Sequence, residues 1–192
     1  PALRDLYDEI WVYGLPQICE PLAGLALPQA VRRKMVYTGY LRREIPATPP
    51  SPDLVAFAQQ PFILVTPGGG GDGEDLIDWV LRAYESDAGL PWRALLVFGP
   101  FMAPERQAEF RERAARLPNL MTKTFDAHIE ALVARADGVV AMGGYNTFCE
   151  ILSFDRRAIL VPRTRPRLEQ YIRAASAERL GLVRMLADDG RR

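Results

Sequence analysis

Histidine, cysteine and lysine are scarce in this chain of 192 residues. His128 is the only histidine, and the two cysteines, Cys19 and Cys149, are far apart. Neither a zinc site nor a disulfide framework follows from that spacing. We therefore expect no metal site, no cofactor, no general base at His128, and the reducing environment of the cytoplasm.

Excess charge and long apolar runs are also missing. The 24 basic residues equal the 24 acidic residues, so the formal net charge is zero and no global field attracts nucleic acid. No signal peptide and no apolar run of membrane-spanning length occurs. The chain begins at Pro1 and not at a methionine, so we expect it to be cut from a longer protein.

Composition changes near residue 50. Prolines cluster at positions 46, 49, 50 and 52, which is typical of a linker, and we place one at residues 46–52. Residues 1–45 contain two short runs typical of strands, at 7–13 and 33–38. Residues 53–192 follow a different pattern and form the second predicted domain.

Strand and helix patterns alternate in that second part. The predicted strands are 62–66, 94–98, 119–124, 138–142, 158–161 and 182–186. The predicted helices are 74–85, 104–116, 126–135 with Asp126 as N-cap, 143–153 and 168–180 with Gly181 just beyond its end. Apolar strands alternating with helices predict an α/β fold, a doubly wound parallel Rossmann-like sheet covered on both faces, in the order 3-2-1-4-5-6.

Two glycine-rich turns follow the first and the fourth predicted strands. One spans residues 67–73 and the other begins at Gly143 and Gly144. In this strand order the two turns flank the switch point, where ligands bind beyond the carboxyl ends of the strands. Glycine lets the backbone approach a ligand, and the following helix offers free N–H groups and a positive dipole end. The pair therefore predicts a phosphate site, to which Asn146 and Thr147 could add hydrogen bonds.

Better-known phosphate motifs are absent. Residues 67–73 lack the Gly-Lys-Ser/Thr of a P-loop. Their spacing is similar to a dinucleotide fingerprint, but Phe98, Gly99 and Pro100 stand where that fold places a ribose-binding acid. Each turn taken singly is also compatible with a simple tight connection.

Four spaced elements carry a family resemblance. They are Gly143-Gly-Tyr-Asn-Thr-Phe-Cys-Glu-Ile-Leu152, the strand Ala158-Ile-Leu-Val that ends in Pro162, the pair Glu169-Gln170, and Ala174. In this order they resemble the donor-binding C-terminal domain of GT-B glycosyltransferases, above all the peptidoglycan N-acetylglucosaminyltransferase (MurG) family. The resemblance covers about residues 61–186. Residues 7–40 are similar to the last strand region of the acceptor domain of that family.

The resemblance implies a role for each matched residue. Glu150 would accept hydrogen bonds from the ribose hydroxyls of a donor nucleotide. Phe125 and Asp126 would meet the edge of the base, and Glu169 and Gln170 the sugar hydroxyls. The α-phosphate would be held by Thr147 and by the backbone of Gly144, Tyr145 and Asn146, in the donor-binding turn that begins at Gly143. The diphosphate and acceptor side would be closed by Gly69, Gly70, Gly71, Asp72 and Gly73.

Some positions depart from the family or stay open. Gly70, Gly71 and Asp72 replace the Ser-Gln that often follows the family's glycines, and Asp72 would repel a diphosphate unless it turns outward or positions a sugar hydroxyl. Arg163, Arg165 and Arg167 follow the fifth predicted strand. They either neutralise the diphosphate in place of a metal or are solvated side chains.

The resemblance implies a metal-independent glycosyltransferase, a hexosyltransferase fragment that binds a nucleotide-sugar donor with UDP favoured. It specifies no acceptor. The catalytic base is expected on the other domain, so this part alone would bind donor without transferring sugar. The full-length protein is left open to a peripheral membrane contact through that domain. Two alternatives remain at this stage, a nucleotide-sugar epimerase of related fold and a nucleotide-binding module without catalysis.

Overall fold

Six parallel strands form the central sheet of the protein, which we describe from a computed structural model. The structure describes residues 2–20, 22, 26–87 and 89–187, so the expected outer domain limits at residues 1 and 192 lie outside the described residues. The strands are β3 (Phe62–Thr66), β4 (Arg93–Val97), β5 (Leu120–Lys123), β6 (Gly138–Ala141), β7 (Ala158–Leu160) and β8 (Arg184–Met185). Their order is β5-β4-β3-β6-β7-β8 and every neighbouring pair is parallel. The predicted doubly wound α/β sheet of order 3-2-1-4-5-6 is therefore confirmed.

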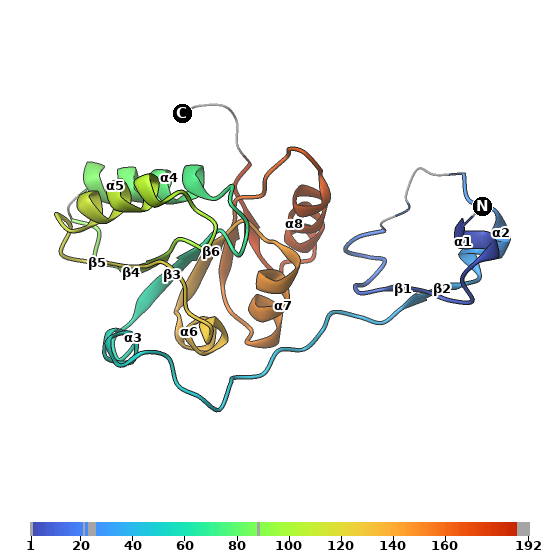
Figure 1. Ribbon diagram of the computed structural model, residues 1–192, viewed down its shortest axis with the longest axis horizontal. Helices are drawn as coiled ribbons and strands as arrows, with labels where there is room; N and C mark the ends of the chain where they lie inside the picture. The colour runs from blue at the N-terminus through green and yellow to red at the C-terminus, as the bar shows by residue number, and fades with distance from the viewer. Residues whose placement is uncertain (1, 21, 23–25, 88, 188–192) are drawn as a thin grey trace.

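Helices connect the strands and lie on both sides of the sheet (Figure 1). They are α3 (Pro52–Phe57), α4 (Glu74–Ser86), α5 (Pro104–Ala114), α6 (Ile129–Arg135), α7 (Tyr145–Ser153) and α8 (Glu169–Arg179). α4 and α5 lie on one side, and α3, α6 and α7 on the other (Figure 1). Gly181 follows α8 with φ +72°, as predicted for the residue that ends a helix.

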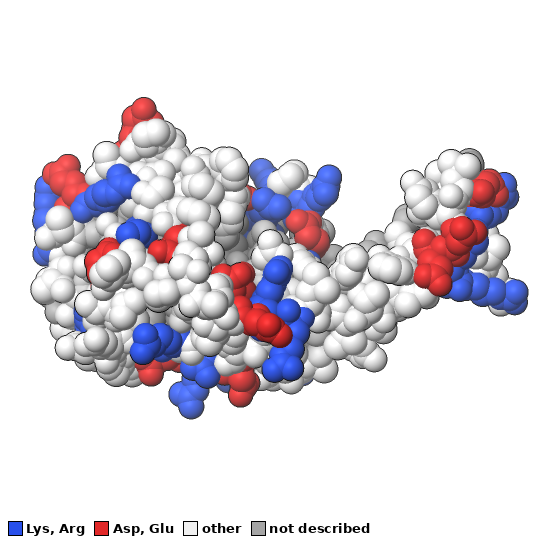
Figure 2. Space-filling model, turned by 60° about the horizontal axis from the view of Figure 1, so that its bottom comes forward, with Lys and Arg blue, Asp and Glu red and all other residues white. Residues whose placement is uncertain are grey.

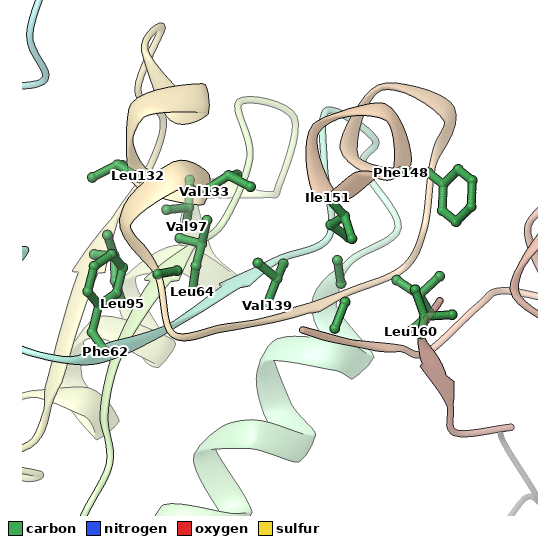
Figure 3. Packing of buried hydrophobic residues seen from close by; sticks show 14 of the residues in the cluster. Phe62, Leu64, Leu95, Val97, Leu132, Val133, Val139, Phe148, Ile151 and Leu160 are labelled. Carbon is green, nitrogen blue, oxygen red and sulfur yellow. The ribbon is translucent and has the colours of Figure 1, made fainter. Parts of the chain in front are cut away.

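The larger core lies between the sheet and the helices α3, α6, α7 and α8, and Figure 3 shows the part of it under α6 and α7. Phe62, Leu64 and Leu95 point into it from the strands, and Phe148 and Ile151 from α7, all with 0–1% exposure. Alternate residues of a strand point to opposite faces, so Val65 and Leu96 enter a second core under α4 and α5. Each such side chain contributes about 1.5–3 kcal/mol through burial.

The two faces of the sheet are covered unequally. Leu160 of β7 is fully buried beneath α7 and α8, whereas its neighbour Ile159, on the face of α4 and α5, is 38% exposed. A groove of about 940 Å³ runs along that face past Val140 and Ile159 to Leu182. Helices α4 and α5 pack over β3, β4 and β5, so the described residues leave this part of the predicted two-sided cover open.

A small N-terminal unit precedes the sheet. It contains α1 (Ala2–Asp5), β1 (Ile10–Val12), α2 (Gln29–Arg32) and β2 (Met35–Tyr37), and its two strands pair in parallel. The predicted strands at 7–13 and 33–38 were too long. The ladder begins at Ile10, and the carbonyl of Tyr7 accepts a hydrogen bond from the side chain of Lys34 (Nζ, 2.7 Å) in place of a bond from a strand backbone. Residues 38–51 then form no helix or strand, and the chain runs extended along the sheet domain (Figure 1).

Some expected boundaries were wrong. Asp126 is not the N-cap of α6, because the helix begins at Ile129 with His128 at the cap position. Asp126 Oδ1 accepts a hydrogen bond from His128 N at 2.8 Å, so its carboxylate closes a turn ahead of the helix. The predicted strand 182–186 is reduced to the two residues of β8, and α3, whose first residue is Pro52, was not expected.

Charge is spread without a dominant sign. Basic and acidic side chains are intermixed over the face shown in Figure 2. In the part of the chain that the structure describes, no helix combines the length and the apolar character needed to cross a membrane.

Candidate functional site

The two glycine-rich turns meet in space. Gly68, after β3, has φ +92°, and a Cβ on it would lie 3.5 Å from Thr147 Oγ1 in the first turn of α7. Gly143, after β6, has φ +76°, and a Cβ there would lie 3.1 Å from Leu160 Cδ1. Positive φ at both positions favours glycine. The turns therefore face each other at the carboxyl ends of the adjacent strands β3 and β6.

The first turn is packed at its base and open at its tip. A Cβ on Gly73 would collide with Pro67, and one on Gly99, from the next strand-to-helix turn, would lie 2.6 Å from Gly68 O. A Cβ on Gly69 would meet no atom within 4 Å, and a Cβ on Gly71 would lie 3.4 Å from Phe101 O. Close backbone packing accounts for Gly73 and Gly99, whereas the tip at Gly69 is free to border a ligand.

Helix α7 begins at the second turn. Gly144 is its N-cap, with φ −54° and ψ 158°, and no side chain caps the helix. Asn146 is exposed and Thr147 is 7% exposed. The first N–H groups of a helix have no partner within it and carry the positive end of its dipole. This end of α7 can therefore bind an anion such as a phosphate.

Four predicted residues form one polar cluster beside these turns. Asp72 forms an ion pair with Arg163, which also contacts Glu169 Oε1 through Nη2 at 3.3 Å. Gln170 is 7% exposed and its Oε1 accepts a hydrogen bond from Arg163 N at 3.2 Å. A Cβ on Gly144 would lie 4.0 Å from Gln170 Nε2, which joins the cluster to the start of α7.

The polar cluster neutralises the carboxylate of Asp72. Its carboxylate lies against the guanidinium of Arg163 and so does not stand as an uncompensated negative charge. Arg163 in turn is shared between two carboxylates, Asp72 and Glu169, and the hydrogen bond to Asp72 raises the pKa of the guanidinium. Arg163 therefore contributes less positive charge to this edge of the sheet than a free arginine would.

Glu150 lies in the second turn of α7 and is 5% exposed. Burial raises its pKa to about 7, from an ordinary value of 4.5. The nearby carboxylate of Glu130 acts in the same direction, and Arg43 opposes it. When it is ionised, this buried carboxylate in the second turn of α7 is suited to accept hydrogen bonds from neutral hydroxyl groups.

Phe125 and Asp126 lie apart from the polar cluster, after β5. Phe125 is 53% exposed and Asp126 is 9% exposed, with its carboxylate turned to His128 N. The sheet order puts β5 at the edge, two strands from β3. The structure thus places most of the predicted residues at the carboxyl ends of the strands, with Phe125 and Asp126 at the end of the edge strand β5.

Sequence patterns missed two groups next to the site. Arg43 donates from Nη2 to Asn146 Oδ1 at 2.6 Å, and its backbone N–H donates to Ser153 Oγ at 2.8 Å. Tyr40 packs on Tyr145 and Phe148, with ring centroids 5.9 and 5.1 Å apart. About a hundred residues separate these partners in sequence, and no local motif marks them.

A cavity of about 460 Å³ lies beside the polar cluster, on the side of α4. Trp79 and Leu76 of α4 line it together with Asp72, Arg163 and Arg165. Among the described residues, no group of three or more His, Cys, Asp or Glu side chains is arranged to hold a metal ion.

The family follows from comparison with known proteins. The glycosyltransferase family 28 C-terminal domain matches residues 62–191, which contain the whole sheet and both turns. The chain therefore belongs to this family of glycosyltransferase domains. A comparison with curated protein sequences gives no match.

Solved structures share the fold. A glycosyltransferase of kitacinnamycin has a TM-score of 0.61 and 16% identity, with 94% of this chain and 42% of that chain covered. MurG of Acinetobacter baumannii has 0.57 and 17%, with 80% and 42% covered. The glycosyltransferase VinC, solved in complex with dTDP, has 0.57 and 18%, with 85% and 42% covered. This chain spans about two fifths of the length of each of the three.

Proposed function

We propose that this chain is the donor-binding part of a GT-B glycosyltransferase and that the donor is a nucleoside diphosphate sugar. The observation that carries the proposal is the meeting of Gly68 with Thr147, which joins the two turns at the switch point of a family 28 domain. If each turn were only a tight connection between a strand and a helix, the two turns would not need to converge on the open start of α7.

The proposed donor lies along this edge of the sheet. The α-phosphate sits on the start of α7, at the backbone of Gly143, Gly144, Tyr145 and Asn146 and the hydroxyl of Thr147. Glu150 accepts hydrogen bonds from the ribose hydroxyls, and its buried position in the second turn of α7 supports this role. The base extends toward Phe125 and Asp126, because they follow the edge strand β5.

The sugar and diphosphate lie on the other side of the start of α7. Gln170 approaches Gly144, so its amide is in place to contact the sugar. The tip of the first turn, with Gly69, Gly70, Gly71 and Asp72, borders the diphosphate. In the proposed reaction an acceptor displaces the nucleoside diphosphate at the anomeric carbon, and the helix N-terminus and loop amides stabilise the charge on the leaving group without a metal.

The N-terminal residues belong, in this proposal, to the end of the acceptor domain. Residues 1–45 contain the separate two-stranded sheet β1-β2. The proposed linker at 46–52 lies in the segment without helix or strand except for Pro52, its last residue, which is the first residue of α3. The acceptor, the catalytic base and any contact with a membrane would then be supplied by the rest of that domain. We favour UDP as the nucleotide of the donor, on the resemblance to the MurG family.

Calorimetric titration of this chain with UDP, dTDP and GDP tests the proposal. At pH 8, where the Glu150 carboxyl is ionised, we expect saturable binding of one of them and a loss of about tenfold in affinity in Glu150→Ala, because a hydrogen bond to a charged group contributes about 1.5–3 kcal/mol. Glu112→Ala is the matched control, since Glu112 is exposed on α5 and pairs only with Arg116 in the described contacts. Absence of binding to all three nucleotides in the wild type would contradict the proposed function.

A further inference from the structure

A buried arginine supports the second turn from behind. Arg173 of α8 is 8% exposed, and its Nη1 donates to Gly143 O at 2.9 Å. Gly143 directly precedes Gly144, the N-cap of α7. The guanidinium therefore fixes the carbonyl of the residue that leads into the start of α7.

Among the residues that the structure places, no anionic side chain balances the charge of Arg173. The rings of Tyr145 and Phe148 lie 5.8 and 5.9 Å from its guanidinium carbon, and its Nε is buried with no hydrogen-bond partner. Within the described ranges no carboxylate forms an ion pair with it. Glu169, one turn earlier on α8, is engaged by Arg163.

Keeping such a cation buried is costly. Removal of an ion from water carries a large desolvation penalty, and the two cation–π contacts return only part of it. Burial raises the pKa of the nearby Tyr40 hydroxyl, and the positive charge of Arg173 opposes that rise. The phenol with its raised pKa stays neutral and does not balance the charge of Arg173. An anion bound at the start of α7 would reduce this imbalance.

We propose that Arg173 is a positioning residue for the diphosphate of the donor. It holds the turn at Gly143 and supplies a fixed positive charge that acts on the phosphates through the poorly screening interior. Arg163 is the cation that the sequence suggests for this task, but two carboxylates already share it. The inference rests on the proposed function and adds the source of its positive charge.

The test compares a nucleoside diphosphate with its nucleoside. Calorimetry uses whichever of UDP, dTDP and GDP the wild type binds, and the corresponding nucleoside measured by competition. In Arg173→Met we expect the diphosphate to bind at least tenfold more weakly and the nucleoside to change less than twofold. The dependence of diphosphate affinity on salt concentration should also become shallower, because a charge has been removed.

Two more variants separate charge from shape. Arg173→Lys keeps the charge and should retain more diphosphate affinity than Arg173→Gln, which keeps polarity only and carries the test if Arg173→Met does not fold. Arg179→Met is the control on the same helix, since Arg179 contacts Ser176 and lies in the last turn of α8. It should leave both affinities unchanged.

The outcomes are distinct. If the wild type binds none of the nucleoside diphosphates, the proposed function fails and the inference fails with it. If the wild type binds but the neutral variants keep its diphosphate affinity, or lose affinity for the nucleoside to the same degree, the proposed function stands and the role of Arg173 is overturned.

Discussion

Single residues at this site differ from their surface counterparts because of burial. Glu150 is the main example, since its pKa rises to about 7 through loss of solvent. Between pH 4.5 and 7 the folded protein keeps a proton on this carboxyl that the unfolded chain has released. Folding stability is therefore greatest at low pH with respect to this group, and falls as pH rises through that window.

Glu150→Gln should remove this dependence. At pH 8 the wild type holds the buried carboxylate in its charged form, so we expect the variant to be more stable by about 1–3 kcal/mol, with little difference at pH 5. Urea unfolding at the two pH values measures both quantities. Glu112→Gln, on the exposed side of α5, is the control and should show no such gain. An equal effect of Glu150→Gln at both pH values would contradict the burial argument.

Between elements, two loops are linked by charge. Asp72 lies in the turn after β3, Arg163 follows β7, and their ion pair crosses the edge of the sheet where we propose the donor to bind. Both side chains are partly exposed, with 43% and 31% exposure, so the pair itself contributes about 0–1 kcal/mol to stability. Its larger effect is on the charge that a phosphate would meet.

Asp72→Asn should therefore strengthen binding of a nucleoside diphosphate. The change removes one negative charge and releases Arg163 from one of its two carboxylates, so we expect a twofold to tenfold gain in affinity that shrinks at high salt. Calorimetry at about 50 mM and about 500 mM salt compares weak with strong screening of this charge. Asp75→Asn, in the first turn of α4, removes a carboxylate in the same region and serves as the comparison. Weaker binding in Asp72→Asn would show that this carboxylate contacts the donor.

At the scale of elements, sequence patterns located all six strands of the sheet but not every boundary. The turn at Asp126 was taken for a helix cap because aspartate suits both structures, and only the backbone path to His128 distinguishes them. The runs at 7–13 and 33–38 form shorter strands because, within the described residues, β1 and β2 have only each other as partners. Residues with a high strand propensity do not continue a strand beyond the end of the partner strand, because no backbone groups are there to pair with them.

In the whole molecule, the sheet is covered unequally on its two faces. Neighbouring residues of β7 show this, because Leu160 is fully buried and Ile159 is 38% exposed above the groove. We expect Leu160→Ala to cost about 2–5 kcal/mol in the free energy of unfolding, since it leaves a cavity against α7 and α8. Ile159→Ala should cost about 1 kcal/mol or less.

Urea unfolding of the two variants measures the difference directly. Both remove aliphatic groups from adjacent positions of one strand, so each is the matched control for the other. A cost for Ile159→Ala equal to that of Leu160→Ala would mean that the groove is covered in solution.

The sequence by itself determined the strand alternation, the strand order and the two glycine turns. These follow from short-range patterns and from the rule that parallel strands need helical crossovers. Only the tertiary structure decided how Asp72 is neutralised, how deeply Glu150 is buried, and that Arg43 and Arg173 flank the start of α7. Such contacts join residues far apart in sequence, and burial depends on every element that packs around a side chain, so no local pattern records them.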